Sequence, residues 1–523
     1  MSPMVQSTQK SNPSLLRQVP DVATPINSLP PEILSEIFLD IVTTEFDDIY
    51  RTRISPRAGG SHSTGSHLGS VCSRWRNVSL RTPALWASFL VRIPRFGYSE
   101  LYIKRLMSHL KRSSSHPLAV TIFVEYGFTS QEQAIVTSAT ADDLPAFSAT
   151  RYLNFTRHML ELIFQHAQRI RSLALTIDSK SDDNAFSSRL LFSLPHHFPV
   201  LSDLRVRIPI EEDTPAFLEY FAASSSIHSL AARFCRSMSR ISERSRFPFT
   251  QITNIELLYA SVDTICNVFA HCPNVQIAHL QFFQDSKEQP PPRTSKLSLP
   301  TLHTLKIGFG EPINLGPVAE LLNDMSFPAL SSLFFDMARF HGPCYSRMRN
   351  EDSHSIFLKP ILHIIASSAS NLRTLRFHRV PFNDQHLLSI LRKTPNLTEL
   401  DVKDMQRKRT GPTNGDNFTI TVRFLEALTK GTTVPKLRAL TMMVWNEWTG
   451  KDVLEAMLEA RMRHAPRLRS TYVKVVNARE AKFDLGRLRA LQEEGLAVRV
   501  VQVPDIRSED ETELLGYGSE AMH

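Results

Sequence analysis

The stretch LRTLRFHRVPFNDQHLLSILRKTPNLTELDV, residues 372–402, carries the pattern that decides the fold. The spacing apolar-x-x-apolar-x-apolar occurs at both ends, as LRTLRF from Leu372 and as LTELDV from Leu397. The last two apolar positions alternate, so they point to one side of a short strand. Between them, Asn383 is a helix-capping residue, and the leucines that follow share one helical face. The stretch therefore predicts a strand, a helix and a second strand.

This spacing recurs along most of the chain. The segments are IRSLAL from Ile170, LSDLRV from Leu201, ITNIEL from Ile252, IAHLQF from Ile277, LHTLKI from Leu302, LSSLFF from Leu330, LRTLRF, LTELDV, LRALTM from Leu437 and the weaker LRSTYV from Leu468. Such a unit cannot bury its apolar face alone, so neighbouring units must stack. Alternating helices and strands with short links favour parallel strands. One such segment would fit an ordinary α/β sheet equally well, but the recurrence favours a repeat array.

The segments that flank this array are less regular. LYIKRLMSHLKRS predicts a helix and HPLAVTIFVEY a strand, and we expect them to be atypical first repeats within residues 91–164. At the other end, FDLGRLRALQEEGLAVRVVQV predicts a closing helix, a stop at Gly495 and a last strand. Residues 504–523 are acidic, and we expect them to be loosely ordered.

Near the start of the chain, NSLPPEILSEIFLDIV, residues 27–42, predicts a helix. Pro30 and Pro31 suit a first helical turn, where a backbone amide would have no partner in any case. Apolar doublets then recur every four residues, which gives an unusually wide apolar stripe. One interpretation is a wholly buried core helix. The other is a helix that serves a local core and an outside partner at once.

A second apolar segment follows a polar stretch. Residues 43–66 are rich in Gly, Ser and His towards their end, which predicts a loop. The sequence HLGSVCSRWRNVSLRTPALW, residues 67–86, then shows helical spacing of its apolar residues, and Thr82-Pro83 predicts the end of that helix.

Together the two segments resemble an F-box, in the form common in large fungal families. Four elements occur in the family's order: the Leu-Pro pair, the apolar helix, the Val-Cys-x-x-Trp element and the final Thr-Pro-x-Leu-Trp sequence. Residues 43–66, which link the two segments, are longer than the usual link. The resemblance implies docking onto the Skp adaptor of a cullin–RING (SCF-type) ubiquitin ligase. It implies adaptor contacts from Leu29, Pro30, Ile33, Leu34, Ile37, Phe38, Leu68, Val71, Cys72 and Trp75. Some of these must be internal core, and the sequence does not separate the two sets.

The array resembles the leucine-rich repeats that follow many F-boxes, although the consensus Asn after each strand is largely missing. We therefore expect an α/β protein: an all-helical F-box followed by an irregular leucine-rich-repeat solenoid with a curved parallel sheet. The expected divisions are a disordered N-terminus (1–25), the F-box with its inserted loop (26–90), a linker with atypical first repeats (91–164), the solenoid (165–503) and the acidic tail (504–523).

The resemblance implies a non-catalytic substrate receptor for ubiquitin-dependent degradation, cytoplasmic or nuclear, without a cofactor or metal. Its partners would be the Skp adaptor, through it a cullin, and a protein substrate of unknown identity. Two other classes stay open: an adaptor-bound scaffold without a ligase role, and, less favoured, a basic repeat protein that binds nucleic acid or a membrane surface. The net charge of +8 over 523 residues is too modest to demand a nucleic-acid partner.

Insertions interrupt the repeat at residues 125–150, 231–247, 283–296 and 403–417. Two of them are basic, and insertions in a solenoid often shape its binding surface. The candidate substrate-binding residues are Arg233, Arg236, Arg240, Arg244, Arg246, Lys403, Arg407, Lys408 and Arg409. They would bind an acidic or phosphorylated segment. The alternative, which is the commoner case for charged loops, is that they are only solvated.

Sequence signals for a secreted protein, a membrane protein or an enzyme are weak. The five cysteines are scattered and none forms a CxxC pair, which favours a reduced, intracellular compartment. The first residues contain no apolar signal segment, and no apolar run is long enough to span a bilayer. No HExxH or G-x-S-x-G motif occurs, and the glycines at 308–316 do not form GxGxxG. The sequence therefore predicts no enzyme active site.

Overall fold

The computed structural model divides the chain into two compact units. One comprises Met1–Leu90 with Leu101–His116, and the other comprises Val91–Glu100 with Pro117–His523. We call them the helical unit and the sheet unit. The structure describes residues 25–51, 64–93, 100–126, 149–179, 197–207, 214–233, 245–282, 296–309, 315–337, 351–380, 382–404, 419–445, 450–463, 467–476 and 485–503.

The helical unit is built from short helices that follow one another along the chain. They are α1 (Pro25–Ser28), α2 (Pro31–Arg51), α3 (Thr64–Val71), α4 (Ser73–Arg81), the 3-10 helix η1 (Pro83–Trp86) and α5 (Glu100–Arg112). Helix α2 begins at Pro31 as expected, with Glu32 in its first turn, where the helix dipole favours negative charge.

The predicted loop 43–66 is partly wrong. Helix α2 continues to Arg51, and α3 already begins at Thr64. The physical reason is that residues 43–51 contain neither proline nor glycine, so nothing interrupts the backbone hydrogen-bond ladder until Pro56 is near. Polar composition was a weaker signal than the absence of helix breakers.

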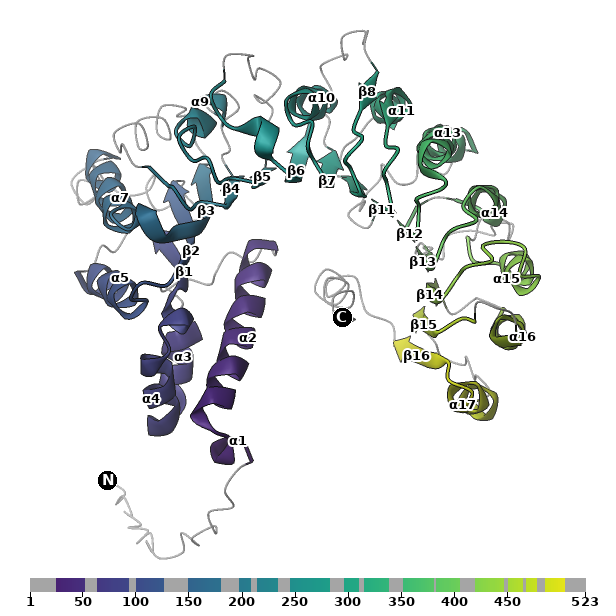
Figure 1. The fold of residues 1–523 in the computed structure, drawn as a ribbon, viewed down its shortest axis with the longest axis horizontal. Helices are drawn as coiled ribbons and strands as arrows, with labels where there is room; N and C mark the ends of the chain where they lie inside the picture. The colour runs from purple at the N-terminus through teal and green to yellow at the C-terminus, as the bar shows by residue number, and fades with distance from the viewer. Residues whose placement is uncertain are drawn as a thin grey trace, which may run out of the picture. The chain divides into compact units, whose positions relative to one another are not determined.

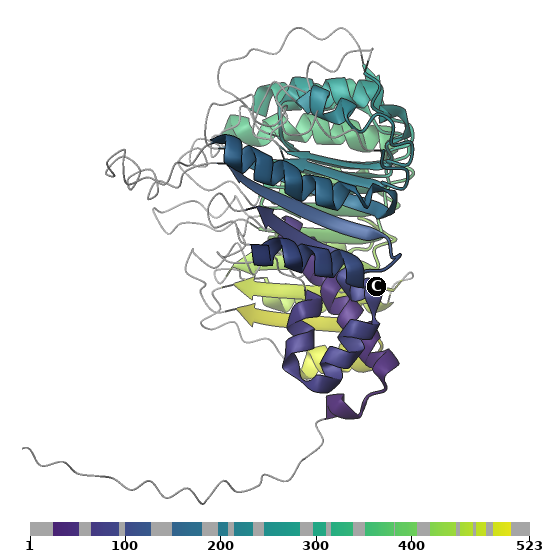
Figure 2. The same cartoon turned by 90° about the vertical axis from the view of Figure 1, so that its left-hand side faces the viewer.

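The sheet unit is a mixed α/β structure with a large parallel sheet. Within the residues just given, fourteen strands pair in the order β1-β2-β3-β4-β5-β6-β7-β9-β11-β12-β13-β14-β15-β16, and β8 pairs with β10 in a separate two-stranded sheet. From β2 to β16 every neighbouring pair is parallel. The strand order therefore follows the chain order, and β15 and β16 can be seen side by side in Figure 2, running in the same direction.

The strand bounds are as follows. They are β1 (Ser88–Ile93), β2 (Leu118–Tyr126), β3 (Ile170–Ser179), β4 (Asp203–Arg207), β5 (Ser229–Arg233), β6 (Asn254–Ala260), β7 (Ile277–Phe282), β8 (Leu297–Ser298), β9 (Thr304–Phe309), β10 (Met325–Ser326), β11 (Ser332–Asp336), β12 (Thr374–His378), β13 (Glu399–Lys403), β14 (Ala439–Trp445), β15 (Ser470–Val476) and β16 (Ala497–Val503).

Helices connect the strands and cover one face of this sheet, while the other face carries no helix from the described residues of the sheet unit (Figure 1). They are α7 (Ala149–Phe164), α9 (Thr214–Glu219), α10 (Val262–His271), α11 (Leu315–Asp324), α13 (Glu351–Ser368), α14 (Asp384–Arg392), α15 (Val422–Thr429), α16 (Lys451–Arg463) and α17 (Leu485–Glu493), with 3-10 turns η2 (Ala167–Arg169) and η4 (Phe249–Gln251). As predicted, Asn383 caps α14: its side chain accepts a hydrogen bond from the His386 amide.

The apolar positions of the repeat lie where the alternation predicts. Leu372 in the turn and Leu375 in the strand are fully buried, and Phe377 is 1 % exposed. Neighbouring strands align these positions, so that Phe335 of β11 stacks on Phe377 of β12 with ring centroids 5.9 Å apart. Each buried side chain of this size contributes roughly 1.5–3 kcal/mol relative to exposure. The core of the sheet unit therefore lies between the strands and their helices.

The sequence missed β1, β5 and the two short strands β8 and β10, and it misplaced one insertion. Strand β1 crosses the predicted boundary at residue 90, and β5 occupies part of the predicted insertion 231–247. The β5 sequence SLAAR places Ala232 at a position where the neighbouring strands carry Val206 and Leu257, which obscured the pattern. Residues 127–148, 234–244, 283–295 and 405–418, which make up most of the predicted insertions, lie outside the described residues, as do the terminal segments 1–24 and 504–523.

Candidate functional site

One row of apolar residues on α2 forms the core of the helical unit. Leu34 and Phe38 are fully buried and Val42 is 5 % exposed, at a spacing of four residues. They pack with Leu68, Val78, Leu85 and Trp86 from the following helices. This row accounts for the stability of the unit but offers nothing to a partner.

A second apolar row runs beside the first on α2 and is exposed. Ile33 is 47 %, Ile37 36 % and Ile41 38 % exposed, again four residues apart. Pro30 is exposed before the first turn, and Leu29 is half-buried. We call Ile33, Ile37 and Ile41 the exposed stripe. Branched apolar side chains on three successive helical turns are costly to leave in water, and such patches mark interaction sites.

The predicted adaptor contacts on the following helices also divide. Leu68 is buried in the core, whereas Val71 at the end of α3 is 61 % exposed. Cys72 caps α4: its Sγ accepts a hydrogen bond from the Trp75 amide at 3.4 Å. The half-buried Trp75 ring packs on Phe38, with centroids 4.7 Å apart.

The predicted set therefore separates into three groups. Leu34, Phe38 and Leu68 are core; Pro30, Ile33, Ile37 and Val71 are exposed; Leu29, Cys72 and Trp75 are intermediate. Ile41 belongs to the exposed row but was missing from the predicted contacts, although its spacing from Ile37 was readable in the sequence.

Polar contacts hold α4 against its neighbours. The Arg74 guanidinium donates to the Leu29 carbonyl before α2. Ser79 donates from its hydroxyl to the Gly65 carbonyl at 2.8 Å. A side chain at Gly65 would bring its Cβ within 3.0 Å of the Leu85 backbone oxygen, so this close approach needs glycine. These bonds fix the helices that flank the exposed stripe.

Helix α5 completes the helical unit around a buried imidazole. The His109 ring lies 5.0 Å from the Trp86 ring and 6.1 Å from that of Phe89. The Arg112 guanidinium lies 4.3 Å from the centroid of the Trp86 ring. Burial, with a smaller contribution from the positive charge of Arg112, lowers the pKa of His109 to about 4. The ring is therefore neutral in the folded protein at pH 7 and acts as an aromatic core residue.

A second candidate surface is the sheet face that lacks helices, which we call the open face. Its side chains form three rows across neighbouring strands, because every second residue of a strand points to the same side. In register order from β3 to β16, skipping the separately paired β8 and β10, the rows are as follows. The amino-end row is Ser172, Asp203, Ser229, Asn254, Ile277, Thr304, Ser332, Thr374, Glu399, Ala439, Ser470 and Ala497. The middle row is Ala174, Arg205, Ala231, Glu256, His279, Lys306, Phe334, Arg376, Asp401, Thr441, Tyr472 and Arg499. The carboxyl-end row is Thr176, Arg207, Arg233, Leu258, Gln281, Gly308, Asp336, His378, Lys403, Met443, Lys474 and Val501.

Charge on the open face changes sign along the strands, from the amino-end row to the carboxyl-end row. In the amino-end row the charged residues are both acidic, Asp203 and Glu399. In the carboxyl-end row, basic residues on β4, β5, β13 and β15 outnumber the acidic Asp336. The open face is therefore electrostatically polarised, with its positive side at the carboxyl ends of the strands.

The acidic groups on the open face are engaged by neighbouring strands. The carboxylate of Asp203 accepts hydrogen bonds from Ser172 and Ser229 and from Arg205 Nε, each at 2.9 Å. This carboxylate therefore ties β3, β4 and β5 together.

Two imidazole–carboxylate pairs join further strands. His279 Nδ1 lies 2.8 Å from Glu256 Oε1, and His378 Nε2 lies 2.8 Å from Asp401 Oδ2. Burial by itself would raise the pKa of each carboxyl. The histidine hydrogen bond and the nearby positive charges outweigh it, so the pKa values of Glu256 and Asp401 are lowered. Both carboxylates are therefore ionised at pH 7.

Aromatic rings hold several arginines on this face. The guanidinium carbon of Arg376 lies 4.7 Å from the centroid of the Phe334 ring, and that of Arg499 lies 5.9 Å from that of Tyr472. A guanidinium stacked in this way keeps its N–H edges available for carboxylates.

The basic residues predicted to bind substrate lie in different settings. Arg233 ends β5 and is half-buried, with its guanidinium 4.9 Å from the centroid of the Tyr259 ring. Lys403 ends β13 on the open face, and Arg246 is exposed after an undescribed segment. Arg236, Arg240, Arg244, Arg407, Lys408 and Arg409 lie outside the described residues.

The structure adds Arg207, which was not predicted. It pairs in register with Arg233 on the adjacent strand, so the two arginines lie side by side. The alternation in LSDLRVR showed that Arg207 points outward, but its neighbour was hidden with β5.

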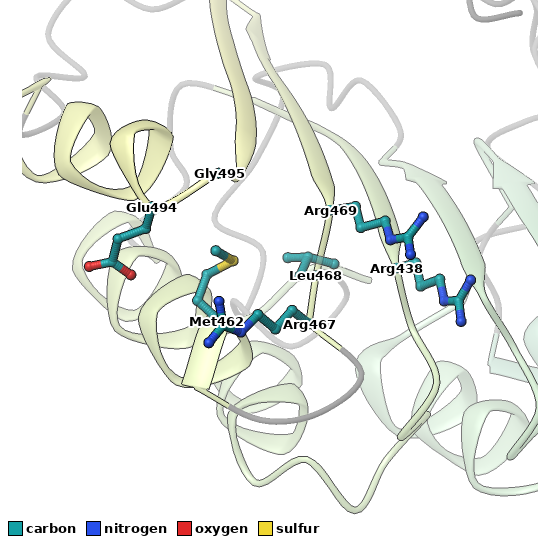
Figure 3. A pocket seen from close by; sticks show the side chains of 7 residues that line it. All are labelled: Arg438, Met462, Arg467, Leu468, Arg469, Glu494 and Gly495. Carbon is teal, nitrogen blue, oxygen red and sulfur yellow. The ribbon is translucent and has the colours of Figure 1, made fainter.

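A shallow hollow lies at the opposite, amino-terminal ends of the last strands. It is lined by Arg438, Met462, Arg467, Leu468, Arg469, Glu494 and Gly495. In Figure 3 the side chains of Arg438 and Arg469 extend in one direction, while those of Arg467 and Glu494 extend away from them. Because its charged groups diverge, the hollow does not form an assembled binding site.

Other kinds of site find no support in the described part of the chain. Those residues contain no group of His, Cys, Asp and Glu side chains arranged to hold a metal ion. Within the same residues, no helix combines the length and the apolar character needed to cross a membrane.

Neither the known family models nor the curated proteins match this chain.

Proposed function

We propose that this chain is an F-box protein, of the form common in fungi, whose sheet unit is an irregular leucine-rich-repeat solenoid. It would act as a substrate-recognition subunit of an SCF-type cullin–RING ubiquitin ligase. The helical unit would bind the Skp adaptor, and the sheet unit would bind a protein substrate. The chain itself would perform no chemistry, because holding ligase and substrate together raises their effective concentration.

The observation that carries the proposal is the exposed stripe on α2. Ile33 and Ile37 are among the residues for which the F-box resemblance implies adaptor contacts, and both are exposed beside a filled core. A helix that served only its own unit would need only the buried row of Leu34, Phe38 and Val42. The stripe is therefore surplus to folding and fits an apolar groove on a partner.

The remaining predicted contacts fit the same function. Pro30 and Val71 are exposed, and Cys72 and Trp75 are partly accessible. Leu34, Phe38 and Leu68 would act indirectly, because they position the helices that carry the exposed residues. The adaptor surface proposed here therefore consists of Pro30, Ile33, Ile37, Ile41 and Val71.

The test is co-expression with a fungal Skp adaptor followed by pull-down. The variant Ile33→Asp with Ile37→Asp should lose the adaptor, because it places two charges in an apolar interface. Ile277→Asp is the matched control, since Ile277 is also 47 % exposed but lies on the sheet unit. The control should retain the adaptor. Failure of the folded natural chain to capture any adaptor would refute the proposal.

Two further readouts distinguish the proposed function from the two alternative functions. Adaptor capture without a neddylated cullin in the pull-down would favour a scaffold without a ligase role. Strong retention on heparin that salt abolishes, without adaptor capture, would favour a nucleic-acid partner. The mixed charges of the open face weigh against the latter, because nucleic-acid surfaces are predominantly basic.

A further inference from the structure

The last strands of the sheet carry a basic area on the open face. It consists of Arg376 on β12, Lys403 on β13, Lys474 on β15 and Arg499 on β16. We call these four residues the basic corner. In the middle and carboxyl-end rows of these strands, one acidic residue, Asp401, stands against the four basic ones. Its carboxylate is bound by His378 at 2.8 Å and is also near the positive charges of Lys403 and Arg376. The corner therefore has an excess of positive charge.

The segment that follows β16 has the opposite charge. Residues 504–523, PDIRSEDETELLGYGSEAMH, contain Asp505, Glu509, Asp510, Glu511, Glu513 and Glu520 against one arginine, Arg507. This segment leaves the sheet at Val503, at the carboxyl end of β16, and the positive row of the open face lies at the same ends of the strands. The acidic segment therefore begins at the same side of the sheet as the positive row.

The length of chain between Val503 and the acidic run matches the width of the corner. From β16 back to β12 there are four strand steps of ~4.8 Å, or about 19 Å. Glu509 is the sixth residue after Val503, and six extended residues span about 20 Å. The run Glu509–Glu513 can therefore reach every basic residue of the corner without crossing the remaining sheet.

We propose that residues 504–523 dock on the basic corner of their own chain. The carboxylates of Glu509, Asp510, Glu511 and Glu513 pair with Lys403, Lys474 and the ring-stacked guanidinium of Arg376. The segment then occupies part of the open face and competes with any acidic partner for it. The contact itself does not depend on the proposed adaptor role, because it involves the sheet unit alone.

The test compares the natural full-length chain with a full-length variant whose segment is neutralised. The variant carries Glu509→Gln, Asp510→Asn, Glu511→Gln and Glu513→Gln. The probe is a fluorescent peptide of residues 505–523, and its binding is followed by fluorescence polarisation. The neutralised variant should bind the peptide about tenfold more tightly than the natural chain, and rising salt should weaken that binding. Equal affinity for the two chains overturns the proposal.

Charge-reversed variants locate the site. In the neutralised background, Lys403→Glu with Lys474→Glu should abolish peptide binding. The matched control is Lys436→Glu with Arg467→Glu, because both residues are exposed and lie at the amino-terminal ends of the last strands. An equal loss in the control overturns the proposal. Circular dichroism of each variant checks that it is folded.

A second measurement needs no substitution. Carbodiimide coupling of the natural chain, followed by mass spectrometry, should join Lys403 or Lys474 to a carboxylate within residues 509–513. A mixture of isotope-labelled and unlabelled chains shows whether the link lies within one chain. Links only between chains, or none, overturn the proposal. The neutralised variant should still capture the adaptor, so this experiment and the adaptor test fail independently.

Discussion

Ile33 and Leu34 are neighbours in the chain, yet Ile33 is 47 % exposed and Leu34 is fully buried. The same division repeats one turn later between Ile37 and Phe38. Each apolar doublet of α2 thus places one residue in the core and one at the surface. The sequence left open a wholly buried core helix or a helix that serves a local core and an outside partner. The exposure of Ile33 and Ile37 excludes the wholly buried helix.

This division predicts opposite effects of neighbouring substitutions on stability. Leu34→Ala should lower the free energy of unfolding of the helical unit by about 2–5 kcal/mol, because it leaves a cavity in the core. Ile33→Ala should change it by no more than about 0.5 kcal/mol, since the side chain is at the surface. Hydrogen exchange of the α2 amides measures both. Similar losses of protection in the two variants would show that Ile33 is also part of the core.

The periodicity of the sequence determines only part of this site. A period of four residues places Ile33, Ile37 and Ile41 in one row and Leu34, Phe38 and Val42 in the next. It does not say which row faces α3 and α4, because that depends on the crossing of helices separated by a long stretch of chain. The identity of the residues was therefore predictable and their division was not.

The sheet shows the same limit. Outward-facing positions such as that of Arg207 follow from alternation, but the placement of Arg207 beside Arg233 requires the register between β4 and β5. The prediction of a parallel α/β sheet was confirmed, because many weak segments agreed. Strand β5 was missed, because Ala231 and Ala232 supply little apolar signal on their own.

The buried imidazole of His109 predicts acid sensitivity of the helical unit. The pKa of His109 falls from the ordinary value of 6.5 to about 4 in the folded state. The unfolded chain therefore binds the proton more readily, and stability is full above pH 6.5 and is lost as the pH falls towards 4. A shift of this size corresponds to at most about 3 kcal/mol.

The measurement is the urea midpoint of the helical unit at pH 7 and at pH 5. His109→Phe should reduce the difference between the two midpoints, because phenylalanine fits among the Trp86 and Phe89 rings and does not titrate. His116→Phe is the control, since His116 is exposed, and it should leave the difference unchanged. An unchanged difference in His109→Phe would mean that another group causes the acid sensitivity.

The pair between His378 and Asp401 predicts a different pH dependence in the sheet unit. Asp401→Asn should cost about 1–3 kcal/mol at pH 7, because it removes a charge-assisted bond from a largely buried position. The pKa of Asp401 is lowered on folding, so its contribution is present above its unfolded pKa and is lost as the pH falls through the folded value.

The natural chain and Asp401→Asn should therefore converge in stability below about pH 4. Thermal unfolding over a series of pH values measures this. Glu399→Gln is the control, because Glu399 lies on the same strand but is exposed, and it should behave like the natural chain at every pH. A difference for Asp401→Asn that is constant with pH would exclude titration of the carboxyl as its cause.

The thiol of Cys272 reports on unfolding of the sheet unit. Cys272 is fully buried after α10, and burial raises the pKa of its thiol to about 12. Only the thiolate reacts readily, so native Cys272 should resist iodoacetamide, while the partly exposed Cys72 and Cys266 should react first. Mass spectrometry of labelled peptides over time separates the three. Labelling of Cys272 should accelerate in urea in step with the loss of circular dichroism. Rapid labelling in the folded protein would instead mean that the sheet opens locally around α10.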